Sequence, residues 1–183
     1  FVFDLMEKVM FYATQTLAIV IDIQQRLVPA MLNSRTFVNK SCQMIKGLNI
    51  LNIPVILTEQ YPRGLGNTVA DVQILSGEWV FEKTQFSALT PEVQTLISRK
   101  KPKNIIVLGC ESHVCVLQTV LALREQNLNV YIPQECIASR TQENKNNGLQ
   151  QMQAAGAIVS NIESILFQLL GDAKHPKFKE ISK

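Results

Sequence analysis

The chain has 183 residues and a net charge of +3, with 46% hydrophobic and 18% charged residues. A chain of this length usually forms one domain with a sizeable core, and this balance excludes an intrinsically disordered protein. The net charge is too small to indicate nucleic-acid binding by itself. No apolar run reaches the ~20 residues that a membrane-spanning helix requires.

Cysteine usage indicates a reducing environment. The four cysteines are Cys42, Cys110, Cys115 and Cys136, and they form no C-x-x-C pair and no regular spacing. This pattern favours neither a disulfide framework nor a zinc site. We therefore expect a cytoplasmic protein, with a mitochondrial location as the open alternative.

The first fifteen residues differ in character from the rest of the chain. They are apolar but carry three charges, without the basic leader or the small-residue cleavage site of a secretory signal. Their apolar positions fit a short helix: Leu5, Met6, Val9 and Met10. We treat residues 1–15 as an N-terminal extension whose role the sequence leaves open, and residues 16–183 as a single domain.

Short apolar segments alternate with helical patterns along residues 16–183. The expected strands cover 16–22, 53–59, 78–84, 104–109, 129–133 and 157–160. The expected helices cover 35–52, a short segment from Thr68, 90–100, 113–127, 140–156 and 161–171. Alternation of this kind with short connections predicts a parallel sheet that has helices on both faces.

Chemically active side chains follow three of these strands. The first strand ends at Asp22, the third ends at Lys83, and Cys115 lies at the start of the helix after the fourth. Ligands of open parallel sheets bind beyond the carboxyl ends of the strands, so we expect an acid, a cation and a thiol at one edge. A helix N-terminus and a nearby lysine lower the pKa of a thiol, which predicts an activated Cys115. The carboxylate would then move the proton, and amides between Glu111 and Cys115 would hold an oxyanion.

Each of these residues also has an ordinary structural reading. A cysteine in the first turn of a helix is most often a small buried residue. An aspartate at a strand end is most often a cap, and a single lysine is most often solvated. The residues by themselves leave the catalytic and the structural readings open. His113 is interpreted as a packing or orienting residue and Cys110 as part of the strand core, whereas Cys42 and Cys136 are interpreted as structural.

Five longer segments resemble a known family. They read "AIVIDIQQRL", "VILTEQYPRGLGNTV", "FEKTQFSAL", "GCESHVCVLQT" and "AGAIVSNIESILFQLLGDAKHPKFKEI". In order and spacing they resemble the isochorismatase-like cysteine hydrolases, and most of all the animal-type isochorismatase domain-containing proteins. The resemblance covers about residues 16–181. It implies a three-layer α/β/α sandwich around a six-stranded, mostly parallel, doubly wound sheet.

The resemblance also implies a site and a reaction. The family's Asp-Lys-Cys triad falls on Asp22, Lys83 and Cys115, with the backbone N–H groups of Glu111 and Cys115 as the oxyanion donors. It places a cis peptide bond between Cys110 and Glu111. The implied function is a hydrolase without cofactor that acts on a small amide- or ester-type carbonyl substrate through a thioester.

The loop after the second strand departs from the nicotinamidases of this family. Those enzymes bind a metal through an Asp-x-His segment, whereas "TEQYPRGLG" contains no histidine, so we predict no metal. The family name describes cleavage of a vinyl ether, a reaction that needs no cysteine nucleophile, so Cys115 favours a carbonyl substrate instead. Arg63 would suit a substrate carboxylate. The candidate substrate contacts are Gln24, Glu59, Gln60, Tyr61, Arg63 and Ser112.

Two other functions are consistent with the sequence. The first is a catalytically silent, oligomeric binding or scaffold protein that uses the same fold. The second is nucleic-acid processing, which has only the net charge and the basic segment 99–103 in its favour and ranks third. We expect a small-molecule substrate and a homo-oligomer as partners, and neither nucleic acid nor a membrane.

Overall fold

The computed structural model of the protein describes residues 11–183, and the helix expected around Leu5 to Met10 lies outside them. The strands are β1 (Thr16–Ile21), β2 (Val55–Gln60), β3 (Val80–Lys83), β4 (Asn104–Cys110), β5 (Asn129–Pro133), β6 (Ile137–Ala138) and β7 (Ile158–Ser160). The α-helices are α2 (Ser34–Ile50), α3 (Pro62–Leu65), α4 (Ala70–Gln73), α5 (Pro91–Lys100), α6 (Leu117–Glu125), α7 (Gln142–Ala154), α8 (Ile162–Leu170) and α9 (Phe178–Ile181). Shorter turns of helix are η1 (Ala13–Gln15), η2 (Val28–Ala30), η3 (Ser112–Val116) and η4 (Gln134–Cys136).

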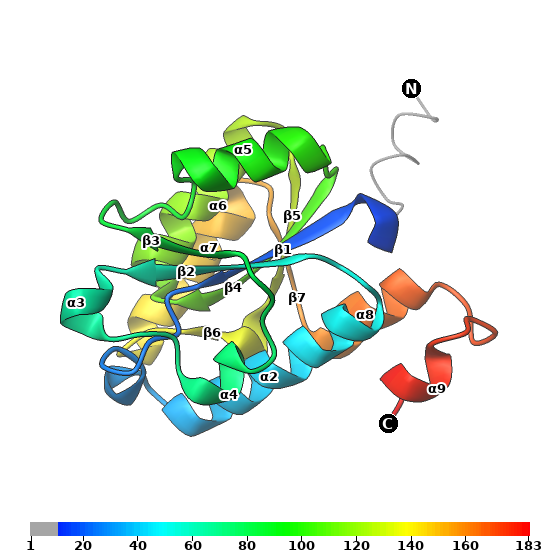
Figure 1. Cartoon of the computed structure of the whole chain (residues 1–183), viewed down its shortest axis with the longest axis horizontal. Helices are drawn as coiled ribbons and strands as arrows, with labels where there is room; N and C mark the ends of the chain where they lie inside the picture. The colour runs from blue at the N-terminus through cyan, green and yellow to red at the C-terminus, as the bar shows by residue number, and fades with distance from the viewer. Residues whose placement is uncertain (1–10) are drawn as a thin grey trace.

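One parallel sheet forms the middle layer of the molecule. Its strand order is β3-β2-β1-β4-β5-β7, and β6 pairs in parallel with the end of β4. In Figure 1, α2 and α8 lie on one side of the sheet and α5, α6 and α7 lie on the other. The predicted doubly wound α/β/α sandwich is therefore confirmed. The strand count was one too low, because β6 has only two residues and leaves no strand-length apolar run in the sequence.

Burial explains why the positions of the strands could be predicted from the sequence. Every residue of β1 and of β4 is buried, because these strands have neighbours on both edges and helices on both faces. In contrast, β3 lies at the end of the sheet, and only its last residue, Lys83, is buried. The helix starts follow from capping: the side chains of Thr90, Thr141 and Asn161 accept hydrogen bonds from backbone N–H groups of α5, α7 and α8.

The segment just before β1 packs onto the body of the domain. Phe11 is 6% exposed, and its ring stacks on that of Tyr131 in β5, with the ring centroids 3.9 Å apart. Within residues 11–183, no helix combines the length and the hydrophobicity needed to cross a membrane.

The strand order reverses between β1 and β4, which both pair with neighbours on either side. At the carboxyl ends of these two strands, Gly109 has a φ of +130°, and a Cβ atom placed on it would lie 2.1 Å from the carbonyl oxygen of Ile21. Only glycine allows this close approach. As a consequence, the residues after β1 and after β4 lie close to one another.

Candidate active site

A buried ion pair lies at the carboxyl ends of β1 and β3. The Nζ atom of Lys83 is 2.8 Å from Oδ2 of Asp22, and both side chains are fully buried. The other carboxylate oxygen, Oδ1, accepts a hydrogen bond from the hydroxyl of Thr58 at 2.8 Å. Taking two charges out of water is costly, so such a pair persists only where further hydrogen bonds satisfy both groups. The predicted meeting of Asp22 and Lys83 is observed.

The ammonium of Lys83 has several acceptors besides Asp22. It donates to the side-chain oxygen of Gln60, and to the carbonyl oxygens of Phe86 at 2.9 Å and Gln85 at 3.3 Å. These acceptors come from β2 and from the chain that follows β3. A lysine surrounded by acceptors in this way is held as a fixed positive charge rather than a mobile surface group.

The thiol of Cys115 lies against this ion pair. The residue is 7% exposed and stands in η3, the π-helical turn that joins β4 to α6. The charges of both Asp22 and Lys83 influence the pKa of this thiol. An acid, a cation and a thiol from three separate strand ends thus gather in one place.

Burial raises the pKa of the Cys115 thiol to about 12, and the negative charge of Asp22 adds to this effect. Lys83 lowers the pKa, in the direction that the sequence predicted, but its contribution is smaller than that of burial and of Asp22. The net direction of the pKa is thus opposite to the one expected from the sequence. The sequence could not show that the thiol is enclosed.

The turn around Cys115 is held by polar contacts. The peptide bond between Cys110 and Glu111 is cis, as the family resemblance implied. The carboxylate of Glu111 accepts hydrogen bonds from the backbone N–H and from Nε of Arg140, at 3.0 and 3.1 Å. Nδ1 of His113 lies 3.1 Å from the hydroxyl oxygen of Ser139, which agrees with an orienting role.

Cys110 is fully buried, and its Sγ donates a hydrogen bond to the carbonyl oxygen of Asp22 at 3.3 Å. Burial raises its pKa well above the ordinary value, and it belongs to the strand core, as predicted. Cys42, Cys110, Cys115 and Cys136 are all free thiols.

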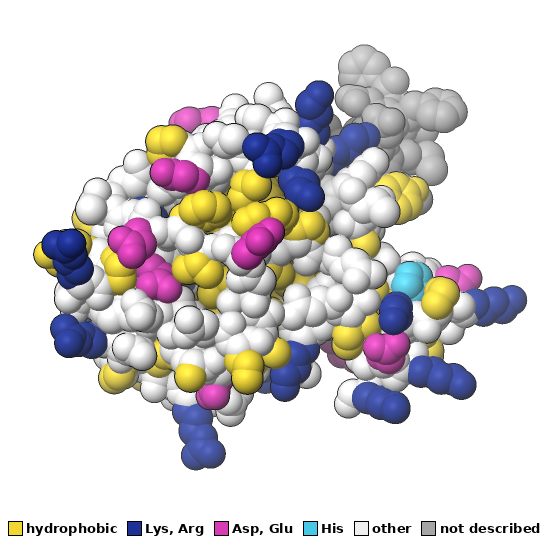
Figure 2. Space-filling model, viewed as in Figure 1, with side chains coloured by type: hydrophobic (Ala, Val, Ile, Leu, Met, Phe, Trp, Pro, Cys, Tyr) yellow, Lys and Arg dark blue, Asp and Glu magenta, His cyan; other side chains and the backbone are white. Residues whose placement is uncertain are grey.

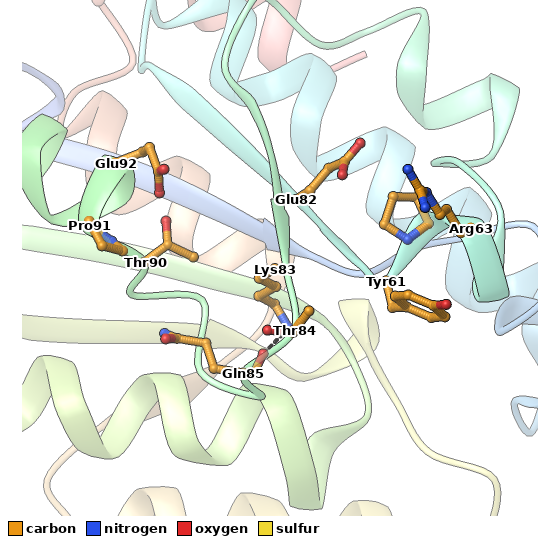
Figure 3. A pocket seen from close by; sticks show the side chains of 10 residues that line it. Tyr61, Arg63, Glu82, Lys83, Thr84, Gln85, Thr90, Pro91 and Glu92 are labelled. Carbon is orange, nitrogen blue, oxygen red and sulfur yellow. Dashed lines mark hydrogen bonds between the residues drawn. The ribbon is translucent and has the colours of Figure 1, made fainter.

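A cavity of about 460 Å³ opens beside β3. Tyr61 and Arg63 line one side of it, residues 82–85 line the middle, and Thr90 to Glu92 at the start of α5 line the other side (Figure 3). In Figure 2 hydrophobic side chains gather below α5, with both acidic and basic side chains around them. Of the three predicted catalytic residues, Lys83 lines this cavity, whereas Asp22 and Cys115 lie outside its lining.

The predicted substrate contacts occupy three kinds of position. Tyr61 and Arg63 line the cavity, and Tyr61 is 55% exposed. Gln24 and Ser112 are completely buried and bond to backbone groups. The carboxylate of Glu59, which is 7% exposed, accepts a hydrogen bond from the hydroxyl of Thr68 at 3.1 Å.

The sequence model of a family described as "Isochorismatase domain" matches residues 16–164. The chain belongs to the isochorismatase family. Isochorismatase domain-containing protein 1 of Salmo salar is 38% identical over 161 residues, which cover 87% of this chain and 57% of that protein. Isochorismatase domain-containing protein 2 of Danio rerio is 37% identical over 163 residues, which cover 88% of this chain and 82% of that protein.

A solved structure agrees with the family assignment. The structure described as the MAR1 ribonuclease of Caenorhabditis elegans is 36% identical, with a TM-score of 0.90, and the match covers 94% of this chain and 90% of that one. The resemblance inferred from the sequence segments is confirmed. The chain spans little more than half the length of the Salmo salar relative. The family assignment applies to the matched domain, residues 16–164.

Proposed function

We propose that the domain is a cysteine hydrolase that acts on a small amide- or ester-type carbonyl substrate. The observation that supports this proposal is the buried Asp22–Lys83 pair, both of whose charges act on the Cys115 thiol. In a merely structural arrangement, a fully buried ion pair at an open strand edge would bring little benefit, because desolvation offsets the attraction of the charges. Beside a nucleophile, the same pair supplies a base and a fixed positive charge.

The raised pKa of Cys115 determines how the reaction begins. Because the thiol is protonated at neutral pH, its proton passes to a carboxylate oxygen of Asp22 as the sulfur attacks the carbonyl carbon. The carbon–oxygen double bond opens to an oxyanion, which the backbone N–H groups of Glu111 and Cys115 stabilise. The positive charge of Lys83 offsets the negative charge that develops on the sulfur and on the oxyanion.

Collapse of this intermediate breaks the bond to the leaving group. The amine or alcohol departs with the proton that Asp22 carried, and the acyl group remains on Cys115 as a thioester. Asp22 then removes a proton from water, the hydroxide attacks the thioester, and the carboxylic acid leaves as the thiol regains its proton. Each step uses groups of this chain, and Asp22 alternates between base and acid.

Recognition of the substrate is assigned to the cavity beside β3. Arg63 would pair with a carboxylate of the substrate, and Tyr61 would pack against its apolar part. The sequence-based expectation of a homo-oligomer remains a proposal, as does a cytoplasmic location.

The test uses p-nitrophenyl acetate, an activated ester that reports on acyl transfer without knowledge of the natural substrate. We expect the wild type to release p-nitrophenol and to carry an acetyl group on Cys115, as located by mass spectrometry after rapid acid quenching. Cys115→Ala should remove both signals, whereas the matched control Cys42→Ala should retain them. Undiminished turnover by Cys115→Ala would refute the proposed nucleophile and would favour the catalytically silent binding protein.

The name of the Caenorhabditis elegans relative raises cleavage of RNA as another function. In this chain the basic residues of 99–103 end α5 and precede β4, whereas Cys115 follows β4, so they lie at opposite ends of the strand. Lys100 also lies over the ring of Trp79, 5.1 Å from its centroid. A phosphate backbone bound there would be far from the thiol, and we therefore favour the small carbonyl substrate.

A further inference from the structure

Two glutamine side chains form a hydrogen-bonded frame around the Asp22–Lys83 pair. Oε1 of Gln24 accepts from the backbone N–H of Gln60 at 2.7 Å, and Nε2 of Gln24 donates to the carbonyl oxygen of Gln60 at 2.9 Å. The same Nε2 donates to the carbonyl oxygen of Gly66 at 2.7 Å. Gln24 thus bonds both the N–H and the carbonyl group of Gln60, and it also bonds the residue that ends α3.

Gln60 in turn holds the side chain of Lys83 in position. Its side-chain oxygen accepts a hydrogen bond from Nζ of Lys83, and its Nε2 donates to the carbonyl oxygen of Thr84 at 2.8 Å. Its amide is therefore oriented, because the nitrogen is held by Thr84 and only the oxygen is left to face the ammonium. Gln24 is 0% exposed, so its part of the frame is shielded from water.

The frame closes into a ring. The backbone N–H of Gln24 donates to the carbonyl oxygen of Asp22 at 3.0 Å, Gln24 holds Gln60, Gln60 holds Lys83, and Lys83 pairs with Asp22. The members come from the carboxyl ends of β1, β2 and β3. The oxygen and the nitrogen of both amides are bonded to groups of the protein, which favours a structural role over a substrate contact.

We propose that Gln60 is a positioning residue that fixes the Lys83 ammonium between Asp22 and Cys115, and that Gln24 holds Gln60 in place. This inference rests on the proposed function, because the lysine needs a fixed position only if its charge supports a reaction at the thiol. The neutral amide has a specific advantage at this position. A carboxylate there would compete with Asp22 for the same ammonium and would add a negative charge to the site.

The charge test replaces Gln60 by an isosteric acid. The charged groups that act on the pKa of the Cys115 thiol are Asp22, which follows β1, and Lys83 at the end of β3, and the thiol of Cys110 at the end of β4 is coupled to it. A further carboxylate raises the pKa of a neighbouring thiol, so Gln60→Glu should slow iodoacetamide labelling of Cys115 at pH 8 by about fivefold or more. Its pH–rate curve should move to higher pH. The surface substitution Gln73→Glu on α4 is the matched control and should leave the curve unchanged.

A second variant distinguishes an effect of Gln60 on the reaction from an effect on the stability of the fold. Gln60→Ala removes the acceptor without adding charge, and we expect kcat on p-nitrophenyl acetate to fall about tenfold or more with KM little changed, since positioning acts on the reacting step. Gln60→Asn should recover part of the loss. If both variants lower the melting temperature but leave the labelling curve and kcat unchanged, Gln60 is only structural and the inference is wrong.

The two proposals can fail independently. If ester hydrolysis persists in Cys115→Ala, the proposed nucleophile is wrong, yet the labelling of Cys115 still reports whether Gln60 controls the charge next to the thiol. If Cys115 is acylated as expected but Gln60→Glu labels at the wild-type rate throughout the pH range, only the positioning inference is refuted.

Discussion

Replacing Asp22 by asparagine should change the reactivity of Cys115 in opposite directions in two assays. The substitution keeps the shape of the side chain and removes its charge. Asp22 raises the pKa of the thiol, so its loss should increase the thiolate fraction and speed alkylation. The same substitution removes the proposed base, so ester hydrolysis should fall by about 10²- to 10⁴-fold.

The magnitude follows from the pKa of about 12. At pH 8 the thiolate fraction of Cys115 is on the order of 10³-fold below that of an ordinary thiol. The higher basicity of the sulfur recovers about 30-fold in intrinsic reactivity, so wild-type labelling should be about 30-fold slower than for a free cysteine. Burial is the largest cause of the raised pKa and Asp22 the second, so removing the charge of Asp22 should bring the pKa only part of the way back to that of an ordinary thiol.

The assay is the rate of iodoacetamide labelling at Cys115 from pH 6 to pH 10, with mass spectrometry to locate the label. We expect Asp22→Asn to label at least about tenfold faster than the wild type at pH 8. The control is Asp71→Asn, because Asp71 raises the pKa of Cys42 instead. It should speed labelling at Cys42 and leave Cys115 unchanged. Labelling of Cys115 in Asp22→Asn at or below the wild-type rate would refute the electrostatic account.

Two further predictions concern stability. Lys83→Met leaves the buried carboxylate of Asp22 without its counter-charge and should lower the free energy of unfolding in urea by about 3–5 kcal/mol. The double variant with Asp22→Asn should recover part of this loss, and a purely additive double variant would contradict the coupling. Gly109→Ala should be severely destabilising, by about 4 kcal/mol or more, because its Cβ would lie 2.1 Å from the carbonyl oxygen of Ile21. Gly77→Ala, where no atom lies within 4 Å of the added Cβ, should melt at nearly the wild-type temperature.

The sequence predicted the frame of the fold well because buried parallel strands leave a simple pattern. The runs that became β1 and β4 are nearly continuously apolar, and the structure buries every residue in them. Asp22 and Lys83 could be placed together because the carboxyl ends of parallel strands meet at one edge. The two-residue strand β6 and the π-helical turn η3 escaped prediction, since neither leaves a periodic pattern in the sequence.

The chemistry of the site was harder to predict than its location. The pKa of Cys115 depends on how completely the surrounding chain excludes water, and no sequence pattern reports this. The hydrogen bonds between Gln24 and Gln60 join residues 36 positions apart, and they depend on the direction of two side chains. Both glutamines were noticed in the sequence because they follow strands, but their partners became clear only in the structure.

Lys83 belongs to a strand at the edge of the sheet. β3 has four residues, pairs only with β2 and buries only Lys83 itself. Edge elements of this kind open in local fluctuations at a lower free energy than central strands, and they exchange their amide hydrogens sooner. The ion pair of Lys83 with Asp22 links this edge strand to the centre of the sheet. The side chain that balances charge at the thiol therefore also stabilises β3. A substitution of Lys83 should therefore affect both the reaction and the local stability of β3.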